Sequence, residues 1–161
     1  MDEDGAHRVR LAGPDDARAV GQLLHDFNVE YDDITPGPEA LARRVVDLLA
    51  ADQLTVLVGF TAAGDAPEGL AALRFRPSIW TDGLECYLAE LYVIPGRRGH
   101  GLGRALVTAA LEVARDRGAD HIDLGTSEND VAARALYEHL GFTNLEGGPG
   151  GPVMYVYERE L

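Results

Sequence analysis

Residues 95–104 of this 161-residue chain read Pro95-Gly96-Arg97-Arg98-Gly99-His100-Gly101-Leu102-Gly103-Arg104. This glycine-rich loop lies between a stretch that resembles a strand and one that resembles a helix. Residues 84–94 ahead of this loop are typical of a long strand, and residues 101–117 repeat apolar side chains at helical spacing. Closely spaced glycines let the backbone approach a ligand, while the first amides of the following helix have no partner within it. These amides and the helix dipole favour an anion, so the loop predicts a pyrophosphate cradle, with Arg97, Arg98 and Arg104 adding positive charge.

Two familiar phosphate-binding motifs match the loop poorly. A P-loop ends in Gly-Lys followed by Ser or Thr, whereas this loop ends in Gly103-Arg104-Ala105. The dinucleotide fingerprint is Gly-x-Gly-x-x-Gly on the first strand of a βαβ unit, whereas here the spacing is Gly-x-Gly-x-Gly and lies late in the chain. A glycine-rich turn without a ligand, or a site for a different phosphate ligand such as a nucleotide, stays open on these residues alone.

The remaining elements follow from periodicity and turn residues. Their order predicts an α/β (α+β) fold, with a mixed, mostly antiparallel sheet of six to seven strands flanked by helices, and the length suits a single domain over residues 1–161. We expect a strand at 7–11, helices starting at Pro14 and after Pro38, strands at 54–60, 69–76 and 84–94, a helix at 101–117, a strand at 121–125, a helix at 130–140 and a final strand pair at 142–146 and 153–159.

The composition indicates an ordinary globular protein, since 46% of the residues are hydrophobic and 25% are charged. The net charge of −13 makes nucleic acid and anionic membranes poor partners and would attract a cationic acceptor, although acidity can also serve solubility alone. Cys86 is the only cysteine, which excludes an internal disulfide and a multi-cysteine metal site. No apolar run reaches the roughly 20 residues of a membrane span, and residues 1–10 are polar, so we expect a cytoplasmic protein.

A second motif follows the loop. Residues 132–142 read Ala-Ala-Arg-Ala-Leu-Tyr-Glu-His-Leu-Gly-Phe, and the loop contains Arg98-x-x-Gly101-x-Gly103 after Leu91-Tyr92-Val93. In this order and at this separation, the two segments resemble the GNAT superfamily of acyl-CoA-dependent N-acetyltransferases, whose signatures are Arg/Gln-x-x-Gly-x-Gly/Ala and Ala-x-x-Leu-Tyr…Gly-Phe. The resemblance is strong over residues 84–142, and the order of elements fits over the whole chain.

The resemblance implies acetyl-CoA as co-substrate. In the family the strand before the loop splays from the next parallel strand and admits the pantetheine arm. A metal is not expected, because the histidines show no metal-ligand spacing. The residues implied to bind the cofactor are Leu91, Tyr92 and Val93 along the arm, Arg98, Gly99, His100, Gly101, Leu102, Gly103 and Arg104 around the diphosphate, and Asn129, Asp130 and Tyr137.

Asp130 marks a departure from the family. Relatives commonly place an asparagine seven residues before the tyrosine of the second motif, where it helps hold the cofactor. This chain has Asp130 there, with Asn129 beside it. Both could still face the side of Tyr137, two helical turns on, but we favour a helix N-cap for Asp130.

Acyl transfer to an amine needs a base for the nucleophile and an acid for the departing thiolate. Glu90 is the predicted base, because strict alternation along a strand places it with Cys86, Leu88 and Tyr92 on a mostly apolar face, where burial raises the pKa of a carboxyl group. A structural glutamate paired with an arginine is the alternative. Glu85, expected on the opposite face, is the weaker candidate.

Tyr137 is the predicted acid. In the family the tyrosine of the second motif lies near the sulfur of the cofactor and is often proposed to protonate the leaving thiolate. A packed aromatic beside Leu140 is the alternative, although a buried hydroxyl still needs a partner.

The acceptor site implied by the resemblance is walled by the first two helices, their connection and the late loop. Acidic and aromatic residues gather at the end of the first helix and in the turn before residue 84, and they suit a cationic amine, although a solvated helix end gives the same pattern. We therefore expect direct transfer of acetyl to a primary amine of a small, cationic acceptor. A peptide or protein N-acetyltransferase and a non-catalytic acyl-CoA sensor are the alternatives, and dimers are common in the family, so a homodimer is one expected assembly. The gathered residues are His25, Asp26, Glu30, Tyr31, Asp32, Asp33, Phe75, Arg76, Trp80 and Asp82.

Overall fold

The computed structural model describes residues 7–61 and 64–161, and the chain divides into two compact units, residues 1–124 and residues 125–161. The expectation about the first ten residues rests largely on residues 1–6, which lie outside the described residues. Whether residues 1–161 act as one domain stays a prediction.

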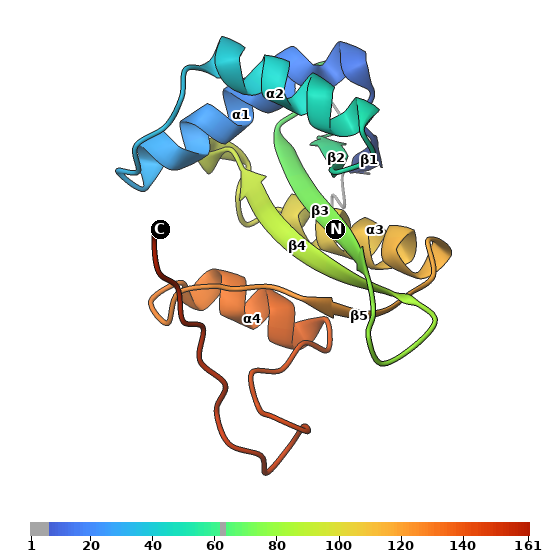
Figure 1. The fold of residues 1–161 in the computed structure, drawn as a ribbon. Coiled ribbons are helices and arrows are strands. Elements are labelled where there is room, and N and C mark those ends of the chain that lie inside the picture. The colour runs from blue at the N-terminus through green and yellow to red at the C-terminus, as the bar shows by residue number, and fades with distance from the viewer. Residues whose placement is uncertain (1–6, 62–63) are drawn as a thin grey trace. The chain divides into compact units, whose positions relative to one another are not determined.

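The first unit contains β1 (Arg8–Leu11), α1 (Ala17–Glu30), α2 (Pro38–Ala50), β2 (Thr55–Phe60), β3 (Gly69–Pro77), β4 (Leu84–Val93), α3 (Leu102–Asp116) and β5 (Ala119–Asp123), with short 3-10 turns η1 (Pro14–Asp16) and η2 (Pro95–Arg97), and the second contains α4 (Val131–His139) (Figure 1).

The sheet of the first unit has five strands in the order β1-β2-β3-β4-β5. The pairs β1–β2, β2–β3 and β3–β4 are antiparallel, and the pair β4–β5 is parallel. The mixed, mostly antiparallel sheet flanked by helices is therefore confirmed, with five strands in place of the six to seven expected.

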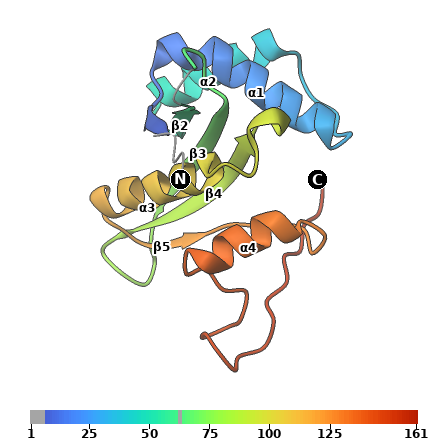
Figure 2. The ribbon, with the colours of Figure 1, turned by 180° about the vertical axis from the view of Figure 1, so that it is seen from behind.

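Alternation along β2 explains why helices cover both faces of the sheet. Val56, Val58 and Phe60 join a core that includes apolar residues of α1 and α2. The intervening Gly59 faces α3 so closely that a Cβ there would lie 2.8 Å from a methyl group of Leu102. The α1–α2 pair and α3 thus pack on opposite faces (Figures 1 and 2).

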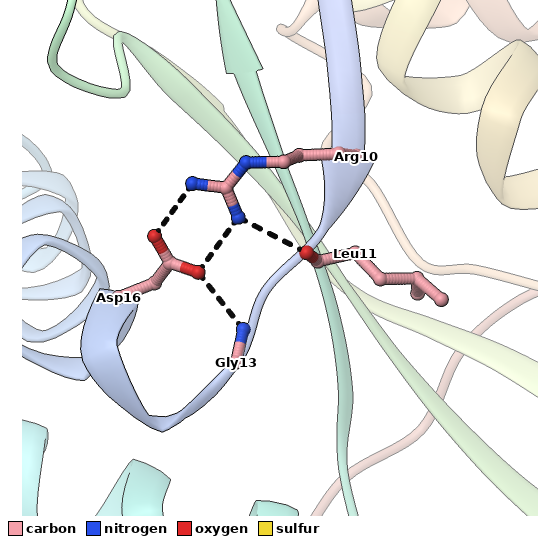
Figure 3. Close-up of polar contacts among 4 residues, drawn as sticks. All are labelled: Arg10, Leu11, Gly13 and Asp16. Carbon is pink, nitrogen blue, oxygen red and sulfur yellow. Dashed lines mark hydrogen bonds and ion pairs between the residues drawn. The ribbon is translucent and has the colours of Figure 1, made fainter.

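The connection from β1 to α1 is fixed by one carboxylate (Figure 3). Asp16 accepts two hydrogen bonds from the Arg10 guanidinium, at 2.8 and 2.9 Å, and one from the Gly13 amide at 2.8 Å. The Arg10 hydrogen bonds are the main reason that the pKa of Asp16 lies below its usual value. The turn into the first helix is therefore set by the residues next to Pro14.

The predicted final strand pair is reduced to a single bridge in the second unit. Leu145 and Val153 form one isolated antiparallel bridge, and neither 142–146 nor 153–159 forms a strand. Three glycines between them, at positions 147, 148 and 150, have positive φ and turn the chain tightly. A strand needs a neighbouring strand along its length, and residues 154–161 are exposed, so the apolar alternation in 153–159 is not enough.

Among the described residues, no helix combines the length and the apolar character that crossing a bilayer demands.

Candidate functional site

An extra residue in β4 decides which way its side chains point. Glu90 lies opposite Ala72 of β3, but Leu88 lies opposite Leu73, so Ala89 has no partner and forms a β-bulge. Because opposite residues share a face, the bulge separates Glu90 from Leu88. The expectation that Glu90, Cys86, Leu88 and Tyr92 share a face is therefore wrong for Cys86 and Leu88, since strict alternation cannot anticipate an inserted residue.

Glu90 and Tyr92 lie on the face that α1 and α2 cover. Their partners in β3 are Ala72 and Leu70, and Tyr92, Ala72 and Leu70 belong to the core beneath these helices. Glu90 is half-buried, and burial raises the pKa of its carboxyl group, although the positive charge of Arg74 opposes the shift. Glu85 also lies on this face, contrary to expectation, but it accepts a hydrogen bond from Arg76 at 2.6 Å.

β4 separates from its parallel neighbour halfway along its length. The pairing of β4 with β5 ends at Tyr87 and Asp123, whereas the pairing of β4 with β3 continues to Val93. Among the described residues, the edge of β4 over residues 88–93 therefore has no strand partner on the β5 side. Leu91, Tyr92 and Val93 lie on this open edge, where their backbone can pair with an extended ligand.

The glycine loop continues directly from this open edge. After η2, Gly99 and Gly101 have φ of +79° and +91°, values that residues with a side chain rarely adopt. Gly101 is the N-cap of α3, and within the described part of the chain no side chain caps the helix. The first amides of α3, at Leu102, Gly103 and Arg104, therefore remain available to an anion.

Three side chains outside the motif hold the loop. Arg97 donates to Glu68 at 2.7 Å, and Arg98 donates to both carboxylate oxygens of Glu30, at 2.8 and 2.9 Å. The imidazole Nε2 of His7 is hydrogen-bonded to the His100 carbonyl oxygen. The loop is thus tied to the start of β3, the end of α1 and the start of β1.

The ion pairs change the role expected of two arginines. Arg97 and Arg98 are each paired with a carboxylate, so their positive charge is largely balanced within the protein. Arg104 is exposed and takes part in no ion pair among the described residues. Backbone amides and Arg104 therefore supply most of the positive potential at the cradle.

In the second unit, Tyr137 lies on α4 with its ring against Phe142, at 5.8 Å between centroids and 64° between planes. Burial, and secondarily the negative charge of Asp130, raises the pKa of Tyr137 to about 12. The phenol is protonated at neutral pH with or without this shift, and the raised pKa makes it a weaker proton donor than an ordinary tyrosine. Asp130 accepts a hydrogen bond from the Ala133 amide at 3.1 Å, which confirms the N-cap, and Asn129 next to it is exposed.

The residues predicted to wall the acceptor site differ in what they contact. His25 is hydrogen-bonded to the Pro36 carbonyl oxygen at 3.0 Å, which holds the connection from α1 to α2, and Asp26 accepts from Gln22 at 2.8 Å. Tyr31 and Trp80 are 53% and 87% exposed and can meet a ligand. Glu30, in contrast, is engaged by Arg98, so it is less available to a cationic acceptor than the sequence suggested.

The structure therefore brings together part of the predicted site. Glu90, the open edge of β4 and the glycine loop follow one another within the first unit, whereas Asn129, Asp130 and Tyr137 belong to the second. The sequence did not reveal Glu68 and His7, and it assigned Glu30 to the acceptor site and not to the loop, because the loop partners of Glu30, Glu68 and His7 lie 68, 29 and 93 positions away.

Two pockets in the first unit lie outside this set. One of about 400 Å³ is lined mainly by apolar residues of β1, β2, α2 and α3, and one of about 550 Å³ lies around the N-terminal half of β4. Neither is lined by Glu90 or by a residue predicted for the cofactor, but the second is lined by Glu85, the weaker candidate for the base, and by Phe75 and Arg76. In the part of the chain that the structure describes, no three His, Cys, Asp or Glu residues gather as metal ligands do.

Comparison with known proteins gives a family and several relatives. The profile of the Acetyltransferase (GNAT) family matches residues 17–142. A mycothiol acetyltransferase of Beutenbergia cavernae is 46% identical over 69 residues, which are 41% of this chain and 23% of that protein. A streptothricin acetyltransferase of Streptomyces lavendulae is 37% identical over 92 residues, 57% of this chain and 46% of that protein. The chain thus spans well under two thirds of the length of the curated relatives that it matches.

Solved structures match over the full length. A protein from Arthrobacter sp. FB24, described as a candidate acetyltransferase, is 44% identical with a TM-score of 0.86, and the match covers 100% of both chains. An aminoglycoside acetyltransferase from an uncultured soil metagenomic sample, in complex with sisomicin, has a TM-score of 0.75 over 99% of this chain and all of that one. At 16% identity, this second match shows that the fold is shared.

Proposed function

The chain belongs to the acetyltransferase (GNAT) family, and from this premise we propose that it transfers the acetyl group of acetyl-CoA to a primary amine of a small, cationic acceptor. The amine nitrogen attacks the thioester carbonyl, the new carbon–nitrogen bond forms, and the carbon–sulfur bond breaks. The products are the acetylated amine and coenzyme A, whose thiolate takes up one proton.

One observation carries the cofactor part of this proposal: the open edge of β4 leads straight into the glycine loop. Backbone groups of residues 88–93 suit the amides of an extended pantetheine arm, and the amides at the start of α3 suit a diphosphate. The two features are consecutive in the chain, so a ligand that is extended at one end and doubly anionic at the other matches both. The residues of the loop also fit coenzyme A better than a nucleotide that carries a metal ion. Residues 95–104 contain no carboxylate and no hydroxyl side chain that could hold such a cation.

Glu90 supports the catalytic part. A carboxylate with a raised pKa, half-buried on the strand that carries the open edge, is suited to take a proton from an ammonium group or through a water molecule. We propose Glu90 as the base and Tyr137, whose phenol stays protonated at neutral pH, as the acid that supplies the proton to the thiolate.

The acceptor class is proposed from charge and from the relatives. The net charge of −13 and the exposed Asp32, Asp33 and Tyr31 at the end of α1 favour a cationic amine. Relatives are named for mycothiol, streptothricin and thialysine, which are small molecules. We also propose that the protein is cytoplasmic and that it forms a homodimer.

A thiol-release assay tests the function. Purified protein is incubated with acetyl-CoA and a panel of amines that includes polyamines, aminoglycosides, amino acids and short peptides, and free coenzyme A is measured. We expect release above the rate without acceptor for at least one small cationic amine. Release only with peptides would favour the peptide N-acetyltransferase, and tight acetyl-CoA binding with no release for any amine would favour a sensor.

A further inference from the structure

Arg98, the first residue of the glycine motif, directs its guanidinium toward the end of α1 and the backbone of β4. Its two terminal donor contacts are with the carboxylate of Glu30, the last residue of α1, and its Nε donates to the Val93 carbonyl oxygen at 2.9 Å. One side chain therefore joins the end of α1, the end of β4 and the glycine loop. Both contacts with Glu30 come from the same nitrogen, Nη2, and are charge-assisted hydrogen bonds, while Nε fixes the other end of the guanidinium.

Aromatic rings pack against one side of the Arg98 guanidinium that contacts Glu30. Arg98 lies over the ring of Tyr92 at 5.5 Å, Tyr92 stacks on Phe27 at 5.1 Å between centroids, and Phe27 meets Tyr31 edge to face. Tyr92 is only 4% exposed, so the platform beneath the guanidinium is part of the core. The Glu30 and Arg98 side chains are 27% and 43% exposed, which leaves the ion pair shielded on one side and open to solvent on the other.

We propose that Glu30 is a positioning residue for cofactor binding: through Arg98 it holds the glycine loop so that the first amides of α3 are presented to the diphosphate. This inference rests on the proposed function, because it assigns a purpose to the loop. Glu30 itself touches no cofactor in this scheme. It acts by fixing Arg98 and, with it, the backbone from Val93 to Gly101.

The direction of one mutational effect separates this role from the obvious alternative. If Arg98 were a cation for the diphosphate, removal of the Glu30 charge would release it and strengthen cofactor binding. If Arg98 instead holds the glycine loop in place and Glu30 holds Arg98, removal of the Glu30 charge makes the loop more mobile and weakens coenzyme A binding. The two roles thus predict opposite signs for Glu30→Gln.

The experiment is a double-mutant cycle with coenzyme A as the probe. Calorimetric affinities are compared for the unaltered protein, Glu30→Gln, Arg98→Gln and the double variant, and Glu39→Gln on α2 serves as a matched loss of one exposed carboxylate. We expect Glu30→Gln to raise the Kd about threefold to tenfold, Arg98→Gln to raise it at least as much, and the double variant to match Arg98→Gln. Glu39→Gln should bind as the unaltered protein does.

A kinetic readout and a folding control complete the test. With a working acceptor, Glu30→Gln should raise the KM for acetyl-CoA and leave kcat within about twofold, a split that general loss of structure would not produce. Unchanged or tighter binding in Glu30→Gln, or fully multiplicative effects in the double variant, would overturn the positioning role while leaving the proposed function intact. If the unaltered protein fails to bind coenzyme A at all, the proposed function fails and the positioning role with it.

Discussion

Glu90 of β4 lies directly opposite Ala72 of β3, on the face of the sheet that α1 and α2 cover. Burial raises the pKa of the Glu90 carboxyl group, and the positive charge of Arg74 opposes this shift. The environment of the proposed base therefore favours its neutral form, and this has consequences for both rate and stability.

The rate should fall on the acid side at a higher pH than for an ordinary glutamate. A base works only when it is deprotonated, and a raised pKa means that Glu90 is protonated earlier as the pH falls. We expect Glu90→Gln to lower kcat/KM about 10²-fold to 10⁴-fold at neutral pH and to remove this acid limb. The matched control is Glu85→Gln, which removes a carboxylate of the same strand that is paired with Arg76. An unchanged profile in Glu90→Gln would assign the base to another group.

The same pKa shift predicts a gain in stability for Glu90→Gln. A carboxyl group whose pKa is higher in the folded state stabilises the fold below its unfolded value of 4.5, and this contribution is lost as the pH rises through the folded pKa. The charged form at neutral pH therefore costs stability. Thermal unfolding should show a higher Tm for Glu90→Gln than for the unaltered protein at pH 7, with the difference vanishing below about pH 4. A lower Tm at pH 7 would contradict the shift.

Tyr137→Phe should lower turnover and spare cofactor affinity. The substitution removes the proposed proton donor but keeps the ring that packs against Phe142. We expect kcat to fall about 10²-fold or more, with the Kd for coenzyme A changed less than about threefold. Single-turnover kinetics and calorimetry measure the two quantities. Phe142→Leu, which alters the same ring contact without touching the hydroxyl, is the control, and an equal loss of turnover there would indicate packing rather than acid catalysis.

Gly101→Val should abolish coenzyme A binding. Gly101 has φ of +91°, which a branched side chain adopts only at a cost of about 1–3 kcal/mol, and a Cβ there would lie 3.3 Å from the imidazole of His7. The loop backbone would have to move away from its anion-binding geometry. Gly96→Ala is the matched control, because a Cβ at Gly96 meets nothing within 4 Å and its φ is ordinary. Coenzyme A binding that survives in Gly101→Val would place the cradle elsewhere.

The Cys86 thiol should not react with thiol reagents in the folded protein. It is 1% exposed, and burial, with a smaller contribution from Asp123, raises the pKa of its thiol to about 11. Ellman's reagent should therefore detect released coenzyme A with little background from the enzyme, and one thiol per chain should appear only after denaturation. Rapid labelling of native protein would show that the strand around Cys86 opens readily.

Local patterns predicted the elements, and long-range contacts decided the site. The strands and helices of the first unit follow the expected order because apolar periodicity and the turn residues Pro14, Pro38 and Gly118 act locally. The orientation of Glu85 and Glu90 could not be predicted, because the bulge at Ala89 depends on how β3 pairs with β4. The carboxylate partners of Arg97 and Arg98 were likewise invisible, since nothing near them in sequence marks Glu68 or Glu30.

The bulge in β4 is a place where this strand can change its length. Deleting Ala89 would remove the residue without a partner, while Leu88 stays opposite Leu73 and Glu90 stays opposite Ala72, so both parts of the strand would keep their faces. Deleting a paired residue such as Tyr87 would instead shift the pairing of β4 with β3 by one place or turn one part of the strand to the other face. A shortened β4 is therefore compatible with the proposed chemistry at the bulge, because Glu90 keeps its orientation there.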